Sequence, residues 1–201
     1  MGHGNRMTTL YLIVARAGSK RLPGKNLRTI QGRSLIAYKA IAAQQSRTCT
    51  WSVISTDSAE MAAEAQKHGV VLGIKRPPEL ATDTATTEDV VRHAVAVREA
   101  EGYPCDAVML LEPSSPFVRP ADYDAAVALM DQTKADFVMG DVLYLFRWNY
   151  LKTRADLYDR PGKVLYYPMV SAQAVDIDTL PDLEHAQRLA EKGWVDLSWI
   201  P

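Results

Sequence analysis

Short apolar runs alternate along the chain with longer stretches in which apolar residues recur every three or four positions. The short runs are typical of buried strands, and the longer stretches have the period of helices that pack one face on a core. The predicted strands are residues 10–14, 51–55, 70–74, 107–111, a region at 137–146 that is compatible with antiparallel pairing, and 164–169. The predicted helices are residues 34–45, 57–68, 87–100, 120–132 and 179–192. This alternation indicates βαβ units and predicts an α/β fold, with a mostly parallel sheet between two helical layers.

The first predicted strand runs directly into a cationic loop. Residues 15–28 contain five Lys and Arg side chains, which are Arg16, Lys20, Arg21, Lys25 and Arg28. Glycine lets backbone N–H groups approach an anion, and Lys and Arg supply charge, so the loop is typical of a polyphosphate site. The spacing of Gly18 and Gly24 fits neither the G-x-x-x-x-G-K-[ST] P-loop nor the G-x-G-x-x-G dinucleotide motif.

Distinctive residues also follow the later predicted strands, at positions 55–57, 76–78 and 112–116. In an open α/β sheet, ligands bind beyond the carboxyl ends of the strands, so these segments are expected to converge on one site. Asp176 and Asp178 are predicted to end a last strand and to point to the same side of it. Two such carboxylates are costly unless a cation lies between them, which predicts Mg²⁺ shared with a triphosphate.

Composition narrows the range of partners. The chain has 201 residues, with Lys+Arg 23 against Asp+Glu 24 and a formal charge of −1, so neither nucleic acid nor an anionic membrane is expected as a partner. Cys49 and Cys105 lack C-x-x-C spacing, which indicates isolated reduced thiols. The N-terminus lacks a signal-peptide core, and a cytoplasmic location is expected. Residues 1–7 are interpreted as an N-terminal extension and residues 8–201 as a single domain.

The segments that follow the strands resemble the acylneuraminate cytidylyltransferase family, whose members attach CMP to acidic sugars such as sialic acid. The matching blocks are I-V-A-R-A-G-S-K-R-L-P-G-K-N-L at 13–27, S-T-D at 55–57, R-P-P-E-L-A-T-D-T-A at 76–85, L-L-E-P-S-S-P at 110–116, and V-D-I-D-T at 175–179 with D-L at 182–183. Five blocks in the family's order imply a Rossmann-like fold of the nucleotidyltransferase type. They also imply CTP-dependent transfer of CMP to an acceptor, with release of pyrophosphate.

The resemblance implies a role for each matching residue. The implied catalytic residues, which stabilise the transferred phosphoryl group, are Arg16, Lys20 and Lys25. The implied nucleotide-binding residues are Ala15, Ala17, Gly18, Ser19, Asn26, Arg76, Ala85 and Thr87, of which Arg76 is expected to recognise the cytosine base. The implied acceptor-binding residues are Glu112 and Ser114, and the implied Mg²⁺ ligands are Asp176 and Asp178.

Several charged residues allow a plainer interpretation. Arg21 and Arg28 are equally consistent with solvated surface charges. Asp57, which has Glu60 three residues later, is interpreted as the cap of a helix. Asp178 is open to a similar interpretation, as a cap of the helix predicted to start at Thr179.

The chain departs from the family pattern in two places. Glu112 stands where the family segment has glutamine, and an ionised glutamate accepts hydrogen bonds but would repel the carboxylate of an acidic sugar. Residues 134–165 are much shorter than the corresponding family stretch, which carries a dimerisation element and aromatic residues that touch the sugar. An acidic, nonulosonate-like sugar is still favoured as the acceptor. The alternatives are a small phosphonate or phosphate acceptor, or a non-catalytic nucleotide-binding relative.

The shortened segment contains a cluster of aromatic residues, Phe146, Trp148 and Tyr150, next to Arg147. Exposed aromatic residues beside an arginine are typical of subunit interfaces. The alternative is that they close the edge of the sheet within one chain. Because the family's dimerisation element is not recognisable, the chain is expected to be a monomer or a dimer unlike the family's usual one.

Overall fold

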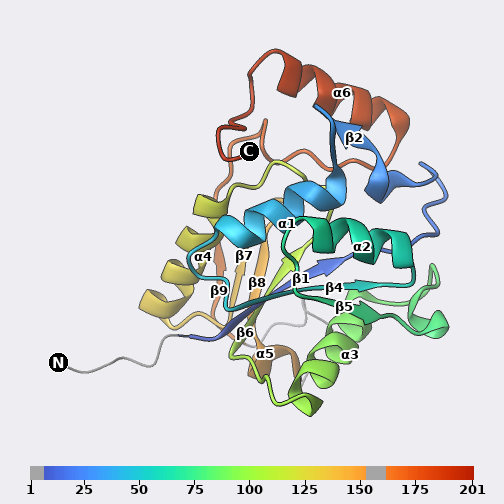
Figure 1. Cartoon of the computed structure of the whole chain (residues 1–201). Coiled ribbons are helices and arrows are strands. Elements are labelled where there is room, and N and C mark those ends of the chain that lie inside the picture. The colour runs from blue at the N-terminus through green and yellow to red at the C-terminus, as the bar shows by residue number, and fades with distance from the viewer. Residues whose placement is uncertain (1–6, 153–161) are drawn as a thin grey trace.

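A seven-stranded sheet forms the centre of the molecule (Figure 1). The computed structural model describes residues 7–152 and 162–201. The strands are β1 (Thr9–Val14), β4 (Trp51–Thr56), β5 (Leu72–Lys75), β6 (Ala107–Leu111), β7 (Phe137–Met139), β8 (Tyr144–Arg147) and β9 (Val164–Tyr166), in the spatial order β5-β4-β1-β6-β8-β7-β9. Strand β8 is antiparallel to both β6 and β7, and the other pairings are parallel. The predicted mostly parallel sheet is confirmed.

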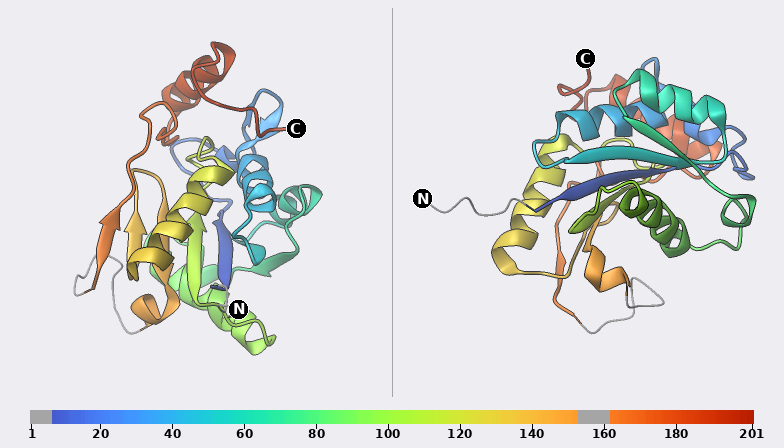
Figure 2. Two further views of the ribbon diagram at one scale, coloured as in Figure 1. Left: turned by 90° about the vertical axis from the view of Figure 1, so that its left-hand side faces the viewer. Right: turned by 60° about the horizontal axis from the view of Figure 1, so that its bottom comes forward.

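Helices cover both faces of this sheet (Figure 2). Helices α1 (Leu35–Gln45), α2 (Ala59–Lys67) and α4 (Pro120–Thr133) lie on one face, and α3 (Thr87–Ala100) and α5 (Trp148–Lys152) lie on the other. Because side chains alternate along a strand, Tyr11 and Ile13 of β1 join one apolar core while Leu10 and Leu12 join the second. The predicted three-layer α/β/α architecture is confirmed.

A third, smaller core lies beyond one end of the sheet. It joins α6 (Leu180–Glu191) to the two-stranded hairpin of β2 (Thr29–Ile30) and β3 (Arg33–Ser34) and to α1, with Ile30, Tyr38 and Ile177 among its buried side chains. The 3-10 turns η1 (Lys25–Leu27) and η2 (Pro78–Leu80) complete the regular elements. Packing in this third core therefore holds α6, near the end of the chain, against the segment that follows β1.

The caps of two helices differ from the sequence prediction. Helix α2 begins after Ser58, whose hydroxyl accepts a hydrogen bond from the backbone N–H of Met61, so the interpretation of Asp57 as the cap is wrong. Helix α6 begins with a capping box between Thr179 and Asp182, so Asp178 is not its cap either. Both aspartates are thus free of a capping role.

The segment that carries Asp176 and Asp178 is not a strand, so the prediction of a last strand ending at these residues is wrong. The backbone N–H of Ile177 donates to the carbonyl oxygen of Ser114 at 2.8 Å, which ties the segment to the loop after β6. The side chain of Ile177 is fully buried in the third core, and that burial anchors the segment. The Ile177–Ser114 hydrogen bond and the burial of Ile177 therefore help to hold this segment, which has no strand ladder.

The aromatic cluster of the shortened segment is buried within the chain. Phe146, Trp148 and Tyr150 are 0%, 7% and 4% exposed, and the indole N–H of Trp148 donates to Glu99 of α3. The interpretation of these residues as an exposed interface is wrong. The alternative is confirmed as far as burial within one chain goes, but Phe146 lies on β8, inside the sheet and not at its edge. Residues 1–6 of the predicted N-terminal extension, and 153–161 of the shortened segment, lie outside the described residues.

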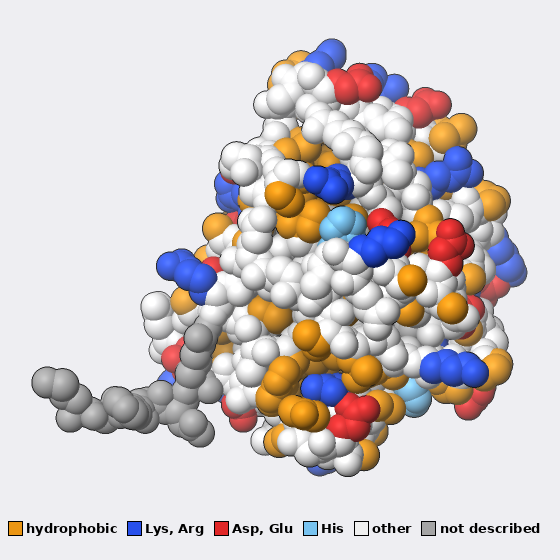
Figure 3. All heavy atoms as spheres, viewed as in Figure 1, with side chains coloured by type: hydrophobic (Ala, Val, Ile, Leu, Met, Phe, Trp, Pro, Cys, Tyr) orange, Lys and Arg blue, Asp and Glu red, His pale blue; other side chains and the backbone are white. Residues whose placement is uncertain are grey.

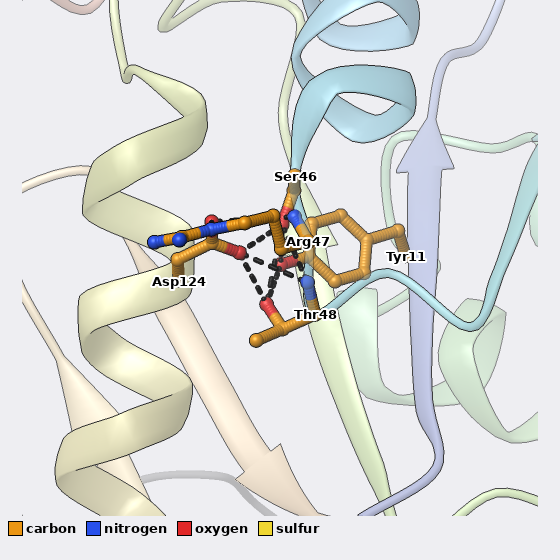
Figure 4. Close-up of polar contacts among 5 residues, drawn as sticks. All are labelled: Tyr11, Ser46, Arg47, Thr48 and Asp124. Carbon is orange, nitrogen blue, oxygen red and sulfur yellow. Dashed lines mark hydrogen bonds and ion pairs between the residues drawn. The ribbon is translucent and has the colours of Figure 1, made fainter.

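A carboxylate on α4 joins this helix to the end of α1 (Figure 4). Asp124 accepts hydrogen bonds from the side chains of Ser46 and Thr48 and from the backbone N–H groups of Arg47 and Thr48. The hydroxyl of Tyr11, from β1, contacts the same Ser46 and Thr48 hydroxyls. The network thus links two helices and a central strand.

The surface carries charges of both signs. On the face seen in Figure 3, the Lys and Arg side chains are interspersed with Asp and Glu, with no extended region of one sign. This agrees with the net charge of −1. None of the helices in residues 7–152 and 162–201 combines the length and the apolar character that a membrane span requires.

Candidate active site

The loop after β1, the η2–α3 connection and the loop after β6 meet around a cleft of about 320 Å³. Eleven residues predicted for the site line this cleft: Arg16, Ser19, Lys20, Lys25, Asn26, Arg76, Ala85, Thr87, Glu112, Ser114 and Asp178. Ala15, Ala17, Gly18 and Asp176 are not among the lining residues. The structure therefore brings together segments that are far apart in sequence, at the carboxyl ends of β1 and β6 as expected.

The cationic loop is held from both sides. The backbone N–H of Ala17 donates to the carboxylate of Asp57 at 2.8 Å, and the buried side chain of Asn26 donates to the carbonyl oxygen of Arg16 at 3.1 Å. Gly24 has φ 66°, a conformation that favours glycine, and it turns the chain into η1. Asp57 thus anchors the loop that carries Arg16 and Lys20. Its place directly after β4, at the same edge of the sheet, was the sequence signal for this role.

Two carboxylates balance the loop cations. Arg16 Nη1 lies 2.6 Å from Asp83, which Lys20 also contacts, and Lys25 Nζ lies 3.0 Å from Asp178. Hydrogen bonds from Lys20 and Arg16 lower the pKa of Asp83, and the hydrogen bond from Lys25 is the main cause of the lowered pKa of Asp178. Both carboxylates therefore stay ionised and hold the cations of the site around the cleft.

The remaining loop arginines separate into two kinds. Arg21 forms an ion pair with Asp178 at 2.5 Å, so it belongs to the charge balance of the cleft. Arg28 donates to the carbonyl oxygen of Pro23 and does not line the cleft. The sequence left both residues open, and only the fold separates them.

Arg76 lies in the wall of the cleft, fixed by the end of β4. Its guanidinium donates to the carbonyl oxygen of Ser55 at 2.8 Å and to the Ser55 hydroxyl at 3.3 Å, and the residue is 6% exposed. Burial lowers the pKa of Arg76 from its ordinary value, although an arginine keeps its charge at neutral pH. Ala85 and Thr87 line the same cleft, where Thr86 caps α3. The rigidly held guanidinium of Arg76 and the start of α3 therefore lie in the wall of the same cleft.

The acidic end of the cleft holds Glu112 and Asp178. Asp176 is exposed, outside the lining. Among the described residues, no group of three or more His, Cys, Asp and Glu side chains is arranged to hold a metal ion. Mg²⁺ requires only one or two carboxylates when phosphate oxygens and water supply the other ligands. Asp178, which lines the cleft, is a carboxylate of the kind that such an ion uses.

One charged residue near this end was missed by sequence reasoning. Lys39 lies in the middle of α1 with an exposure of 0%, and its ammonium donates to the hydroxyl of Tyr123 at 2.9 Å. Burial lowers the pKa of Lys39 to about 7, although the nearby carboxylates of Glu112 and Asp176 act in the opposite direction. In the sequence, Lys39 occupies an inward position of an otherwise apolar helix, which was the only available signal.

Comparisons with known proteins agree with this geometry. Residues 10–192 match the family described as "Cytidylyltransferase". The chain is 42% identical over 123 residues to a CMP-N,N'-diacetyllegionaminic acid synthase of Legionella pneumophila, covering 61% of this chain and 53% of that protein. It is 35% identical over 112 residues to an N-acylneuraminate cytidylyltransferase of Escherichia coli, covering 56% and 26%. The chain thus spans about half the length, or less, of these curated relatives.

The fold is also similar to that of a solved cytidylyltransferase structure. A CMP:2-keto-3-deoxy-manno-octonic acid synthetase complexed with CTP superposes with a TM-score of 0.72, over 92% of this chain and 99% of that one. The sequence identity is 17%, so this likeness supports the fold. The expected Rossmann-like nucleotidyltransferase architecture is confirmed.

Proposed function

We propose that this chain, which belongs to the cytidylyltransferase family, transfers CMP from CTP to an acidic sugar of the nonulosonate type and releases pyrophosphate. The observation that carries the proposal is the cleft at the carboxyl end of the sheet, where Arg16, Lys20 and Lys25 converge beside Asp178. Relatives named for transfer to diacetyllegionaminic acid and to pseudaminic acid support the acceptor class. The free thiols Cys49 and Cys105 are compatible with a cytoplasmic site of action.

Arg16, Lys20 and Lys25 bind the triphosphate in this proposal. Each of them is held by a carboxylate in the free protein, at the cleft that the triphosphate would enter. Binding exchanges Asp83 and Asp178 for phosphoryl oxygens, so little reorganisation of charge is needed during the reaction. As the acceptor oxygen bonds to the α-phosphorus, these cations stabilise the charge that moves onto the pyrophosphate group.

Arg76 recognises the cytosine base. Its guanidinium is fixed by Ser55, so the orientation of its donors is set before the nucleotide binds. The main chain near Ala85 meets the amino edge of the base and Thr87 meets the ribose. An acceptor that faces the exocyclic amino group favours cytosine over uracil, because uracil has a carbonyl oxygen at that position.

Cytidylyltransferases of this kind generally use a divalent metal ion. We assign Mg²⁺ to Asp178, with Asp176 as the neighbouring carboxylate of the same segment. When bound, the ion neutralises the triphosphate and polarises the α-phosphoryl group. Arg16, Lys20 and Lys25 orient the triphosphate, and Glu112 and Ser114 line the part of the cleft that we assign to the acceptor.

The release of pyrophosphate tests the proposal. The purified protein is incubated with CTP, Mg²⁺ and a panel of acceptors that contains nonulosonic acids, a neutral hexose, and a small phosphonate. We expect acceptor-dependent release only with the nonulosonic acids. Pyrophosphate release with the phosphonate alone would contradict the proposed acceptor class but would still support transfer of CMP. No release with any acceptor would contradict the proposed function.

A further inference from the structure

Glu112 differs from the other carboxylates that line the cleft. Asp83 and Asp178 are each held by two cations. The half-buried carboxylate of Glu112, at the end of β6, makes no hydrogen bond or ion pair with any of the described residues. It is therefore the one cleft carboxylate, within residues 7–152 and 162–201, that can accept a proton without first breaking an ion pair.

The charges around Glu112 come from four elements. Burial is the main cause of the raised pKa of Glu112, and Asp176 and Asp178 of the segment before α6 act in the same direction. Lys39 of α1 and Lys25 of η1 favour the ionised form. Tyr123 of α4 also faces this group, and its hydroxyl accepts the hydrogen bond from Lys39. The carboxylate of Glu112 thus lies between a buried cation behind it and the cationic loop in front of it.

Lys39 explains how a glutamate can be placed here. An isolated ammonium in an apolar interior is costly, and Tyr123 satisfies only one of its three donors among the described residues. Glu112 and Asp176 are close enough to stabilise its charge, and the same attraction stabilises the ionised carboxylate of Glu112. Lys39 and Glu112 therefore each favour the charged form of the other.

We propose that Glu112 takes the proton of the attacking acceptor hydroxyl and that Lys39 is the residue that positions it. The inference rests on the proposed function. The acceptor oxygen bonds to the α-phosphorus, its proton moves to a carboxylate oxygen of Glu112, and the bond from the α-phosphorus to the bridging oxygen breaks. Pyrophosphate leaves with that electron pair, and Glu112 returns the proton to solvent before the next turnover.

Replacement of Glu112 tests the proton transfer. In Glu112→Gln, we expect kcat to fall about 100-fold while the dissociation constant for CTP, measured by calorimetry, stays close to that of the wild type. Glu112→Ala should lose as much, and added formate should restore part of its rate, because the small carboxylate can enter the vacated space. Glu191→Gln, on the exposed last turn of α6, is the matched control and should retain wild-type kcat.

Replacement of Lys39 tests the positioning. In Lys39→Met, the acid limb of the plot of kcat against pH should move to higher pH. The reason is that the loss of a positive charge makes Glu112 easier to protonate. A residue that acts only in packing would change kcat without moving the limb. Lys192→Met, at an exposed position after α6, controls for the loss of a lysine and should leave the limb unchanged.

The outcomes separate this inference from the proposed function. Wild-type turnover together with full kcat in Glu112→Gln would overturn the role of Glu112 and keep the transfer of CMP. A folded, inactive Glu112→Ala whose rate formate does not restore would also overturn proton transfer. Absence of turnover in the wild type with every acceptor would overturn both.

Discussion

Single charged residues decide the chemistry of this cleft, and each loop cation that contacts the cleft is already paired. Arg16 and Lys20 share Asp83, and Lys25 shares Asp178 with Arg21. These pairs are partly exposed, so their contribution to the stability of the fold is small. In the proposed function, these pairs matter because they orient the cations before the triphosphate binds.

Lys20→Ala is predicted to remove transition-state stabilisation. We expect kcat to fall by about two orders of magnitude, because the loss of one charge contact to a developing anion costs several kcal/mol. The melting temperature should stay unchanged, since the Lys20 side chain is 80% exposed. Steady-state kinetics and thermal unfolding of the same preparation make the comparison. A folded variant with near-normal kcat would remove Lys20 from the catalytic set.

Lys39 gives a prediction for stability. Its pKa of about 7 in the folded protein lies below the ordinary value of 10.5, so between these limits the unfolded chain binds more protons and the wild type gains stability as pH rises. Lys39→Met should lack this gain and be more stable than the wild type at pH 7. Urea unfolding at pH 7 and at pH 9.5 measures the difference. An equal rise in both proteins would contradict a neutral Lys39 at high pH.

Secondary-structure elements differ in how far the sequence determined them. The strands β1, β4 and β6 and the helices α1, α3 and α4 were predicted closely, because apolar period and caps act locally. The segment with Asp176 and Asp178 was predicted wrongly as a strand. Its alternating pattern imitates a strand, but it is held by contacts to distant loops, among them the bond from Ile177 to Ser114 and the ion pair of Asp178 with Lys25. Asp57 was wrongly predicted to cap a helix. Its actual partner, the backbone N–H of Ala17, lies 40 residues away in the sequence, so a local pattern could not reveal it.

The join between α1 and α4 gives a prediction at the same scale. Burial alone would raise the pKa of Asp124, but hydrogen bonds from Ser46, Thr48 and the backbone lower it overall. Asp124→Asn should therefore destabilise the fold by about 2 kcal/mol at pH 7, through lost charge-assisted hydrogen bonds. The stabilising effect of the carboxylate is lost as pH falls through its lowered pKa, so the gap between variant and wild type should close in acid.

Asp131→Asn is the matched control for this prediction, because Asp131 lies on the same helix with a side chain that is 64% exposed. It should unfold at the wild-type urea concentration. Equal stability of Asp124→Asn and the control at pH 7 would contradict the role of the network in joining α1 to α4.

At the scale of the whole molecule, the chain has a cytidylyltransferase fold in which an aromatic cluster is buried within the chain. Phe146, Trp148 and Tyr150, which looked available to a partner, are buried in the apolar core that β8 and α5 share with α3 in the same chain. Their burial depends on contacts to distant elements, which a sequence pattern of aromatic residues does not reveal. The site is the opposite case: its blocks follow successive strands, so the sheet brought most of the predicted residues into one cleft.

The assembly state follows from this burial. Because these aromatic residues are used within one chain, we expect a monomer of about 22.3 kDa, or a dimer formed through a surface other than the family's usual one. Light scattering over a range of concentrations measures the mass. A dimer that survives dilution and buries the acceptor edge of the sheet in the family's usual manner would contradict this prediction.

Nucleotide dependence of pyrophosphate release tests the central proposal most directly. The protein, Mg²⁺ and one nonulosonic acid are incubated separately with CTP, UTP, ATP and GTP, and the sugar product is identified by mass. We predict release with CTP alone, matched by an equal amount of the CMP-sugar, because Arg76, Ala85 and Thr87 frame the base. Equal release with ATP or UTP, or release from CTP without a CMP-sugar, would contradict the proposed transfer of CMP.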